Sequence, residues 1–490
     1  MTPRSDRFTP TLALNGPNRH FLGMVTGRSS GTLLFRLALM VFAGCATVMR
    51  CESGALVSGP MLGYSEHREV LVWVEVEDAG SVSMTYWAEG EPDAIHSIEI
   101  AAPPPHPAGG SIVKFRPGLL DPGTTYHYSL SIDGEPLEFP TPLHFKTRIL
   151  WEWRDGPPDL SFLTGSGAYL NEAVYDRPGT PYGKGTGIFR HMADSGADFM
   201  VWLGDNLYLR EADWSSESGI WYRYRHDRGT PDLQKLFASM PHWAIWDDHD
   251  FGPDNSNRSF EMKETTLAAF NAYWGNPTAG EQDNPGIYTK FFRGDAAFIL
   301  LDNRFHRDDS RLDQDLNPEK TMYGARQLDW LKQSLLQAQH PPHFNFKFIV
   351  TGSRFLQSHT TGGESANEFR REREEIIDFI RDHAITGVVF LTGDIHTTVL
   401  QRHDRPGMYP LFELTSSPLS SGVSRRRLPG IMSDPNRIDG TVVGDQNYCR
   451  IDMAGPPDDR SLTLHCYDKT NTLRWTHTLK AKELTFSAQP

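Results

Sequence analysis

Three short clusters of acidic, aromatic and histidine residues each follow a run of apolar residues. They lie in residues 198–208, 243–250 and 388–396. Short apolar runs between turn signals predict buried central strands of an α/β sheet. Ligands of open α/β sheets collect beyond the carboxyl ends of such strands, so we expect the clusters to meet. Converging carboxylate, phenol and imidazole groups are typical of a site for one or two metal ions. The pattern therefore predicts a metal-dependent hydrolase.

The first cluster has the form Gly-Asp-x-x-Tyr and contains Asp205 and Tyr208. A carboxylate at Asp205 can bridge two metal ions, and a phenolate three residues later can bind the harder of them. Taken alone, the pattern also fits an Asp205 that caps a loop and a Tyr208 that packs in the core. The first cluster is therefore informative only together with the other two.

The second cluster places three carboxylates around one imidazole, in residues 247–250. Like charges packed together are costly unless a cation neutralises them, which favours a metal site. We predict Asp248 as a ligand and His249 as the group that protonates a leaving oxygen or binds a phosphate. Asp250 is predicted to orient the ring of His249. Asn255, a few residues later, offers an amide oxygen and is the weaker ligand candidate.

The third cluster, residues 393–396, sets two ligand types two residues apart, beside a glycine at which the backbone can turn sharply. Asp394 and His396 are the predicted ligands, and Thr397 and Thr398 are predicted to donate hydrogen bonds to the site. One such tripeptide also fits an ordinary turn at a strand end. Three clusters in this order, each after a predicted strand, are difficult to attribute to chance.

Two domains are expected, because 490 residues exceed what one hydrophobic core usually supports. Residues 59–148 alternate apolar and polar side chains between frequent turn signals, a pattern that predicts a small all-β sandwich. Within it, Tyr126 follows a turn in the manner of the tyrosine corner of immunoglobulin-like and fibronectin type III domains. From about residue 150 predicted strands and helices alternate, which indicates an α/β domain over residues 149–485.

The chain is acidic, with a formal net charge of −14. A surface of this sign repels the phosphate backbone of nucleic acids, so we expect no specific nucleic-acid binding. Most of these acids fit an ordinary solvated surface, and the charge by itself does not indicate a metal site.

Residues 1–44 have the features of an export signal. A basic flank precedes the short apolar stretch 37–44, which is followed by Cys45. Such a stretch is too short for an ordinary membrane helix and is typical of a secretory signal. Residues 42–45 resemble a bacterial lipobox. We therefore predict a lipidated Cys45, a tether over residues 45–58 and a periplasmic or extracellular protein anchored to a membrane. A plain signal peptide cut nearby is the alternative.

Cys449 and Cys466 lie almost symmetrically about the turn at residues 455–459 and are expected to face each other across a hairpin. An oxidising compartment permits a disulfide between them. Cross-strand placement is geometrically awkward for a disulfide, so two reduced, buried cysteines fit the pattern equally well.

Taken in order, the forms Gly-Asp-x-x-Tyr, Asp-Asp-His-Asp and Gly-Asp-x-His resemble the alkaline phosphatase D family of calcineurin-like metallophosphoesterases. Residues 243–253, 301–304 and 413–418 share in the resemblance, which spans nearly the whole chain after the signal. It implies an α/β fold, a four-layer αββα metallophosphoesterase sandwich preceded by a small all-β sandwich domain. It also implies hydrolysis of small or polymeric phosphomonoesters or phosphodiesters by a hydroxide that metal ions activate.

The same resemblance implies a role for each candidate. Asp205 would bridge the metal ions, Tyr208 and His396 would bind the first ion, and Asp248 and Asp394 would bind the second. The metal ions would be divalent and in part trivalent, with iron, calcium or both as the family implies. His249 would assist the departure of the alcohol.

The chain departs from the family at the end of the first strand of the α/β domain, where relatives carry Cys or Asp and this chain has Gly167. Glycine has no ligand atom, and the loss of a thiolate weakens selection for iron. Water, Ser166 or Asn171 would have to substitute, or the first metal position is weak. The alternative function is therefore a catalytically degenerate member that acts as a binding lipoprotein.

Three arginines, Arg223, Arg225 and Arg354, are candidates for holding the non-bridging oxygens of a phosphate. Each of them also fits a solvated surface arginine. The sequence leaves both interpretations open.

Overall fold

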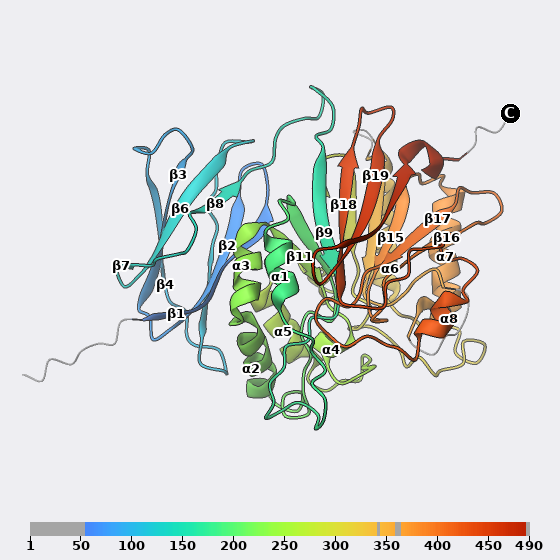
Figure 1. Cartoon of the computed structure of the whole chain (residues 1–490), viewed down its shortest axis with the longest axis horizontal. Coiled ribbons are helices and arrows are strands. Elements are labelled where there is room, and N and C mark those ends of the chain that lie inside the picture. The colour runs from blue at the N-terminus through green and yellow to red at the C-terminus, as the bar shows by residue number, and fades with distance from the viewer. Residues whose placement is uncertain (1–53, 341–343, 358–363, 487–490) are drawn as a thin grey trace, which may run out of the picture. The chain divides into compact units, whose positions relative to one another are not determined.

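The computed structural model describes residues 54–340, 344–357 and 364–486, which belong to one compact unit, Glu52–Pro490 (Figure 1). The predicted signal, the lipobox and Cys45 lie outside the described residues. In the described part of the chain, no helix combines the length and the apolar character that a membrane crossing requires. The domain boundary after residue 148 stays a prediction, because both sides of it belong to the same unit.

The N-terminal part consists of two antiparallel sheets. One contains β1 (Ala55–Ser65), β2 (Val70–Glu77) and β5 (Ser111–Phe115), and the other contains β4 (His96–Ala101), β3 (Ser81–Ala88), β6 (Thr125–Ile132) and β7 (Glu135–Pro136), with β8 (Leu143–Lys146) paired to β6. Residues in β3 alternate between buried and half-buried, as in a strand with one face in a core. The predicted corner is confirmed, because the backbone N–H of Asp121 donates to the Tyr126 hydroxyl at 2.9 Å.

The α/β part contains two six-stranded sheets. The first has the order β11 (His242–Ile245), β10 (Phe199–Leu203), β9 (Leu160–Gly165), β18 (Asn447–Ala454), β19 (Ser461–Asp468) and β20 (Leu473–Lys480). The second has the order β12 (Thr289–Arg293), β13 (Ala296–Leu300), β14 (Phe346–Thr351), β15 (Val388–Thr392), β17 (Leu411–Thr415) and β16 (Val399–His403). Strands β9, β10 and β11 run parallel, as do β13, β14, β15 and β17.

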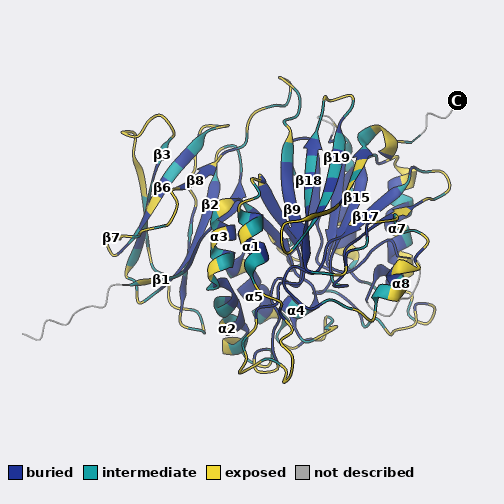
Figure 2. Cartoon of the chain, in the orientation of Figure 1, coloured by how far each residue is buried: buried dark blue, intermediate teal, exposed yellow. Residues whose placement is uncertain are grey.

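The two sheets pack face to face and helices cover their outer faces, which confirms the predicted four-layer αββα arrangement (Figure 1). Phe162 of β9 meets Phe298 of β13 and Phe348 of β14 edge-on, at ring distances of 5.1 and 5.3 Å. Figure 2 shows these central strands buried along most of their length. The helices are α1 (Gly187–Ala193), α2 (Glu217–Arg228), α3 (Pro231–Ser239), α4 (Asp248–Phe251) and α5 (Lys263–Tyr273) after the strands of the first sheet, and α6 (Ala325–Gln339), α7 (Arg370–Asp382) and α8 (Leu428–Met432) in the second half.

The β-sandwich packs directly against the α/β part. The indole N–H of Trp73 donates to the carbonyl of Ala272 at 2.9 Å. The fully buried Glu75 accepts hydrogen bonds from the Tyr273 hydroxyl at 3.1 Å and from His106 at 2.8 Å. Since a buried carboxylate needs such partners, this contact is a specific one, and the sandwich is a packing partner of the α/β part.

Cys449 and Cys466 lie opposite each other in the β18–β19 hairpin, as predicted. Both are buried and free, so the reduced alternative describes this structure.

Candidate metal centre

All three clusters lie at the carboxyl ends of strands, and they come from both sheets. Asp205 follows β10, and Asp248 begins α4 directly after β11, in the first sheet. Asp394 and His396 follow β15 of the second sheet. The short helix α4 lies below the ends of these strands in Figure 1. Segments that are far apart in the sequence thus supply one site.

Four candidate residues have a left-handed backbone. They are Asp205 (φ 51°), Asn255 (φ 59°), Asp394 (φ 67°) and His396 (φ 52°). Residues other than glycine rarely adopt this conformation, which costs about 1–3 kcal/mol each and clusters at functional sites. The sharp turns direct these residues away from the strand direction, at a cost in backbone energy that the rest of the fold must offset.

The first half of the site joins Asp205, Tyr208 and His396. The Tyr208 hydroxyl lies 3.1 Å from Oδ2 of Asp205 and 2.9 Å from Nε2 of His396. Nδ1 of His396 lies 2.7 Å from the carbonyl oxygen of Gly422, which can only accept a hydrogen bond. Nδ1 therefore carries the proton, and Nε2 keeps a lone pair on the side of Asp205. A backbone carbonyl that fixes the tautomer in this way is usual for a metal-binding histidine.

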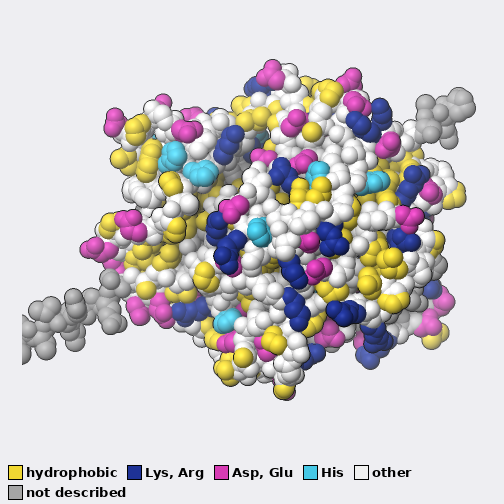
Figure 3. Space-filling model, viewed as in Figure 1, with side chains coloured by type: hydrophobic (Ala, Val, Ile, Leu, Met, Phe, Trp, Pro, Cys, Tyr) yellow, Lys and Arg dark blue, Asp and Glu magenta, His cyan; other side chains and the backbone are white. Residues whose placement is uncertain are grey.

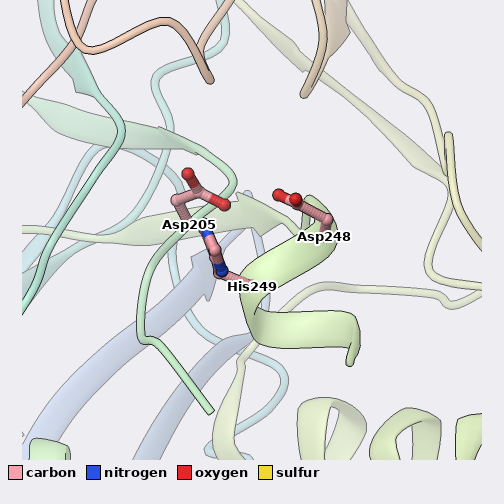
Figure 4. Close-up of side chains that lie close together, drawn as sticks. All are labelled: Asp205, Asp248 and His249. Atoms are coloured by element: carbon pink, nitrogen blue, oxygen red, sulfur yellow. The ribbon is translucent and has the colours of Figure 1, made fainter. Parts of the chain in front are cut away.

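The second half of the site brings Asp205, Asp248 and His249 together, with one ligand atom of each within 4.8 Å of the others (Figure 4). The two carboxylates face each other across the gap in Figure 4. Oδ2 of Asp248 accepts the backbone N–H of Asn255 at 2.8 Å. Asn255 itself is exposed, and its amide nitrogen donates to Asp254. The backbone of Asn255 thus supports a carboxylate, and its role as a ligand stays a prediction.

One oxygen on each of Asp205, Asp248 and Asp394 is buried and accepts no hydrogen bond. Burial raises the pKa of Asp394 to about 6 against the opposing charge of Arg427, and the charges of Asp248 and Asp205 add to the rise. Burial would also raise the pKa of Asp248, but the positive charge of His249 and a nearby arginine hold it below its usual range. Buried carboxylates that repel one another and lack donors fit a cation, so the donor set suits a metal ion.

His249 lies at the edge of the site, with its ring 4.3 Å from the ring of Tyr208. Burial lowers its pKa, but the negative charges of Asp248, Asp205 and Asp254 outweigh that effect and raise it overall. The prediction that Asp250 orients this ring is wrong. Asp250 accepts hydrogen bonds from the backbone of Asp247 and from Asn206, because it closes the first turn of α4, whereas Asp254 lies 3.7 Å from Nε2 of His249.

A family model, described as PhoD-like phosphatase, matches residues 178–452, which is more than half of the chain. The chain belongs to this family. Alkaline phosphatase D of Bacillus subtilis (strain 168) is 26% identical over 325 residues, which cover 57% of this chain and 52% of that protein. The chain thus spans about half the length of this curated relative.

Two solved structures share the fold of this chain. A structure of PhoD matches with a TM-score of 0.67 and 17% identity, over 87% of this chain and 92% of that chain. The purple acid phosphatase PPD1 from yellow lupin (Lupinus luteus) seeds matches with a TM-score of 0.61 and 11% identity, over 87% of this chain and 74% of that chain. At these identities the likeness shows the fold alone.

Sequence reasoning missed three side chains that contact the candidate ligands. Nη2 of Arg304 lies 3.9 Å from Asp248, and Nη1 of Arg427 lies 3.4 Å from Oδ1 of Asp394. The Tyr182 hydroxyl lies 2.8 Å from Nδ1 of His396. Arg304 had a signal, since residues 301–304 belong to the segments that resemble the family. Tyr182 and Arg427 lie in loops and had none.

Two of the three candidate clamp arginines bind carboxylates outside the metal centre. Arg223 contacts Asp213 at 2.8 Å, and Arg225 contacts Glu77 at 2.9 Å. The surface interpretation is wrong for Arg223 and Arg354, which are both buried. The clamp and surface interpretations both rested on residue type alone. Residue type does not show whether an arginine forms an ion pair inside the folded protein.

The loop that replaces the family's cysteine has little room for a side chain. Gly167 has φ 77°, and a Cβ there would lie 2.9 Å from Oγ of Ser421. Asn171 exchanges two hydrogen bonds with the backbone of Gly183, so its amide is engaged there. The Ser166 hydroxyl is buried without a hydrogen-bond partner, which leaves it the better placed of the two substitutes.

Proposed function

We propose that this protein hydrolyses phosphomonoesters or phosphodiesters with the help of metal ions bound at the strand ends. One observation carries the proposal. The buried carboxylates of Asp205, Asp248 and Asp394 each keep an oxygen that accepts no hydrogen bond. Nε2 of His396 lies beside them, 2.9 Å from the Tyr208 hydroxyl. Membership of a phosphatase family supports the reaction class.

The donors divide between two metal positions. Asp205 contacts Tyr208 and His396 on one side and faces Asp248 on the other, so it is placed to bridge. Tyr208 and His396 would hold the first ion, and Asp248 and Asp394 the second. Burial raises the pKa of Tyr208, with the charge of Asp205 adding to the rise, so this phenol loses its proton only to a strong cation.

Metal ions held by these residues would lower the pKa of a bound water molecule and would offset the negative charge that develops on oxygen. The protein's own groups bind, orient and transfer protons. His249 keeps 23% of its side chain exposed, and its raised pKa favours the protonated form. It is therefore suited to protonate the departing alcohol oxygen. The ring of Tyr208 lies 4.3 Å from the ring of His249, at an angle of 34° between the ring planes, and limits its movement.

Export and a lipid anchor on Cys45 complete the proposed function. The support is the basic flank, the apolar stretch and the lipobox-like residues 42–45. Metabolic labelling with a fatty acid tests the anchor. Label on the wild-type protein and none on Cys45→Ser is the expected result, and an unlabelled wild-type protein would refute the anchor.

The test of the enzymatic proposal is elemental analysis of the purified protein together with a panel of chromogenic phosphomonoesters and phosphodiesters. We expect bound metal, with iron and calcium measured first, and turnover that a chelator abolishes. Absence of bound metal and of turnover across several divalent ions would favour the alternative, a degenerate member that only binds a ligand. Gly167, which offers no ligand atom, is the feature that motivates this alternative.

A further inference from the structure

Arg427 reaches the metal centre from the loop before α8. Its Nη1 lies 3.4 Å from Oδ1 of Asp394, the carboxylate whose other oxygen accepts no hydrogen bond. The Arg427 side chain keeps 26% of its surface exposed, so it borders both the buried carboxylate and the solvent. From this position the guanidinium can contact a ligand that enters the site, and the loop that carries Arg427 does not have to move.

The second arginine of the centre is placed differently. Arg304 has no exposed surface, and it contacts Asp247, Asp248 and Glu364. A guanidinium enclosed in this way neutralises the protein's own carboxylates and cannot reach a ligand at the mouth of the site. Of the two arginines that contact candidate ligands, Arg427 alone borders the solvent.

Arg427 and His249 lie near the same carboxylates. Asp394, and after it Asp248 and Asp254, raise the pKa of Arg427, and Asp248 and Asp254 are among the groups that raise the pKa of His249. Asp254 is exposed, so this shared neighbour marks the rim of the site. Figure 3 shows Lys and Arg side chains gathered on the face between α4 and α8 as these are labelled in Figure 2.

We propose that Arg427 binds the non-bridging oxygens of the substrate's phosphoryl group. A guanidinium offers two parallel N–H donors that match two phosphate oxygens, and its charge does not depend on pH in the working range. The contact with Asp394 holds the guanidinium at the site before the substrate arrives, which reduces the entropy lost on binding. The inference rests on the proposed function and replaces Arg223 and Arg225 as the phosphate clamp.

The test compares Arg427→Gln with the wild-type protein. We measure metal content by elemental analysis, the affinity for inorganic phosphate by calorimetry on the metal-loaded protein, and KM and kcat for a chromogenic phosphoester. Loss of a charged hydrogen-bonding partner predicts phosphate binding weaker by about 10- to 100-fold and a raised KM, with metal content unchanged. Arg427→Lys is expected to recover part of the affinity, because it keeps the charge and loses the paired donors.

Arg425→Gln is the matched control, since Arg425 is exposed and two residues away in the same loop. It should bind phosphate as the wild-type protein does. Unchanged phosphate affinity in Arg427→Gln would overturn the proposal. So would a parallel loss of metal and phosphate, because Arg427 would then only support Asp394. If the wild-type protein binds phosphate but holds no metal and shows no turnover, the proposed enzymatic function is refuted. The phosphate affinities of the wild-type protein and Arg427→Gln would still test the role of Arg427.

Discussion

Two groups of buried acidic side chains lie in the α/β part, and they are neutralised in different ways. In the first, the fully buried Arg223 contacts Asp213 at 2.8 Å, Glu172 at 2.9 Å and Asp227 at 3.5 Å. We call these four residues the arginine-paired group. Its carboxylates surround one guanidinium, so the cation that they need belongs to the protein.

The second group consists of Asp205, Asp248 and Asp394, which we call the metal-site group. The carboxylates of Asp205 and Asp248 face each other (Figure 4), and the arginines that contact the group lie 3.9 Å from Asp248 and 3.4 Å from Asp394. Each keeps an oxygen that accepts no hydrogen bond. One guanidinium contacts all three carboxylates of the arginine-paired group, whereas Arg304 and Arg427 each contact one carboxylate of the metal-site group.

The comparison shows that a cluster of buried acidic side chains is not by itself evidence for a metal site. A central guanidinium makes such a cluster structural, because removing it would leave uncompensated buried charges. Buried carboxylates that repel one another lower the stability of the folded protein unless a cation neutralises them. The two groups should thus respond in opposite ways to substitution.

The largest expected effect is the loss of activity in Asp205→Asn. If Asp205 bridges two metal ions as proposed, its neutralisation should lower kcat/KM by about 1,000-fold or more and reduce bound metal. Activity and elemental analysis measure this. Asp213→Asn, in the arginine-paired group, is the control and should keep its metal. Full activity in Asp205→Asn would contradict the bridging role.

Next in size is the loss of stability in Arg223→Met. Removing the central guanidinium leaves the buried Asp213 and Asp227 and the partly buried Glu172 without their cation and should lower the free energy of unfolding by about 3–5 kcal/mol. Urea denaturation measures it, and Arg425→Met serves as the exposed control. A loss below about 1 kcal/mol, the value of a surface pair, would place Arg223 in the same class as surface arginines.

A smaller effect of opposite sign is expected for Asp394→Asn in the metal-free protein. Burial and the charges of Asp248 and Asp205 disfavour the ionised form of Asp394. Neutralising it should therefore raise the free energy of unfolding by about 1 kcal/mol in the presence of a chelator. Asp213→Asn, under the same conditions, should lower it. If both variants lose stability equally, the two groups do not differ as described.

A buried histidine is expected to make the stability of the protein depend on pH. His242 accepts the indole N–H of Trp202 on Nδ1 at 3.1 Å and lies 3.0 Å from the carbonyl of Leu236 on Nε2. Burial lowers the pKa of His242 from 6.5 to about 3. The unfolded chain takes up a proton that the folded chain does not, so stability should fall as the pH drops from about 6.5 towards about 3.

The slope should approach about 1.4 kcal/mol per pH unit from this group, as measured by urea denaturation at several pH values. His242→Gln keeps a donor and an acceptor and does not titrate in this range, so its slope should be smaller. An identical slope in the variant would show that His242 is not the group responsible.

Strands with apolar runs were the elements best predicted from the sequence. The runs that end before residues 205 and 394 are β10 and β15, because a strand covered on both faces must be apolar throughout. Helix α2 was missed. Its buried side chains include Arg223, Asp227 and Arg228, so the apolar periodicity that marks a helix is absent from its sequence. In the folded chain its buried face combines Ile220 and Tyr224 with the ion pairs of Arg223, which only the tertiary structure assembles.

The candidate ligands could be predicted because their residue types recur in short motifs at strand ends. The partner of His249 could not, since Asp250 is the nearer of the two in the sequence, and only the start of α4 turns Asp250 away and leaves the more distant Asp254 beside the ring. Tyr182 and Arg427 come from loops that are distant in the sequence, and nothing near them indicates the site.

Hydrophobic periods and local turns are short-range properties, so they were enough to predict the apolar strands and the residue types that follow them. The order of the layers was implied by the resemblance to the family and not by these local patterns. The tertiary structure was needed to show that the carboxylates of the arginine-paired group surround one guanidinium and that those of the metal-site group do not. That outcome depends on distances between segments up to 200 residues apart, such as Asp205 and His396, which no local pattern encodes.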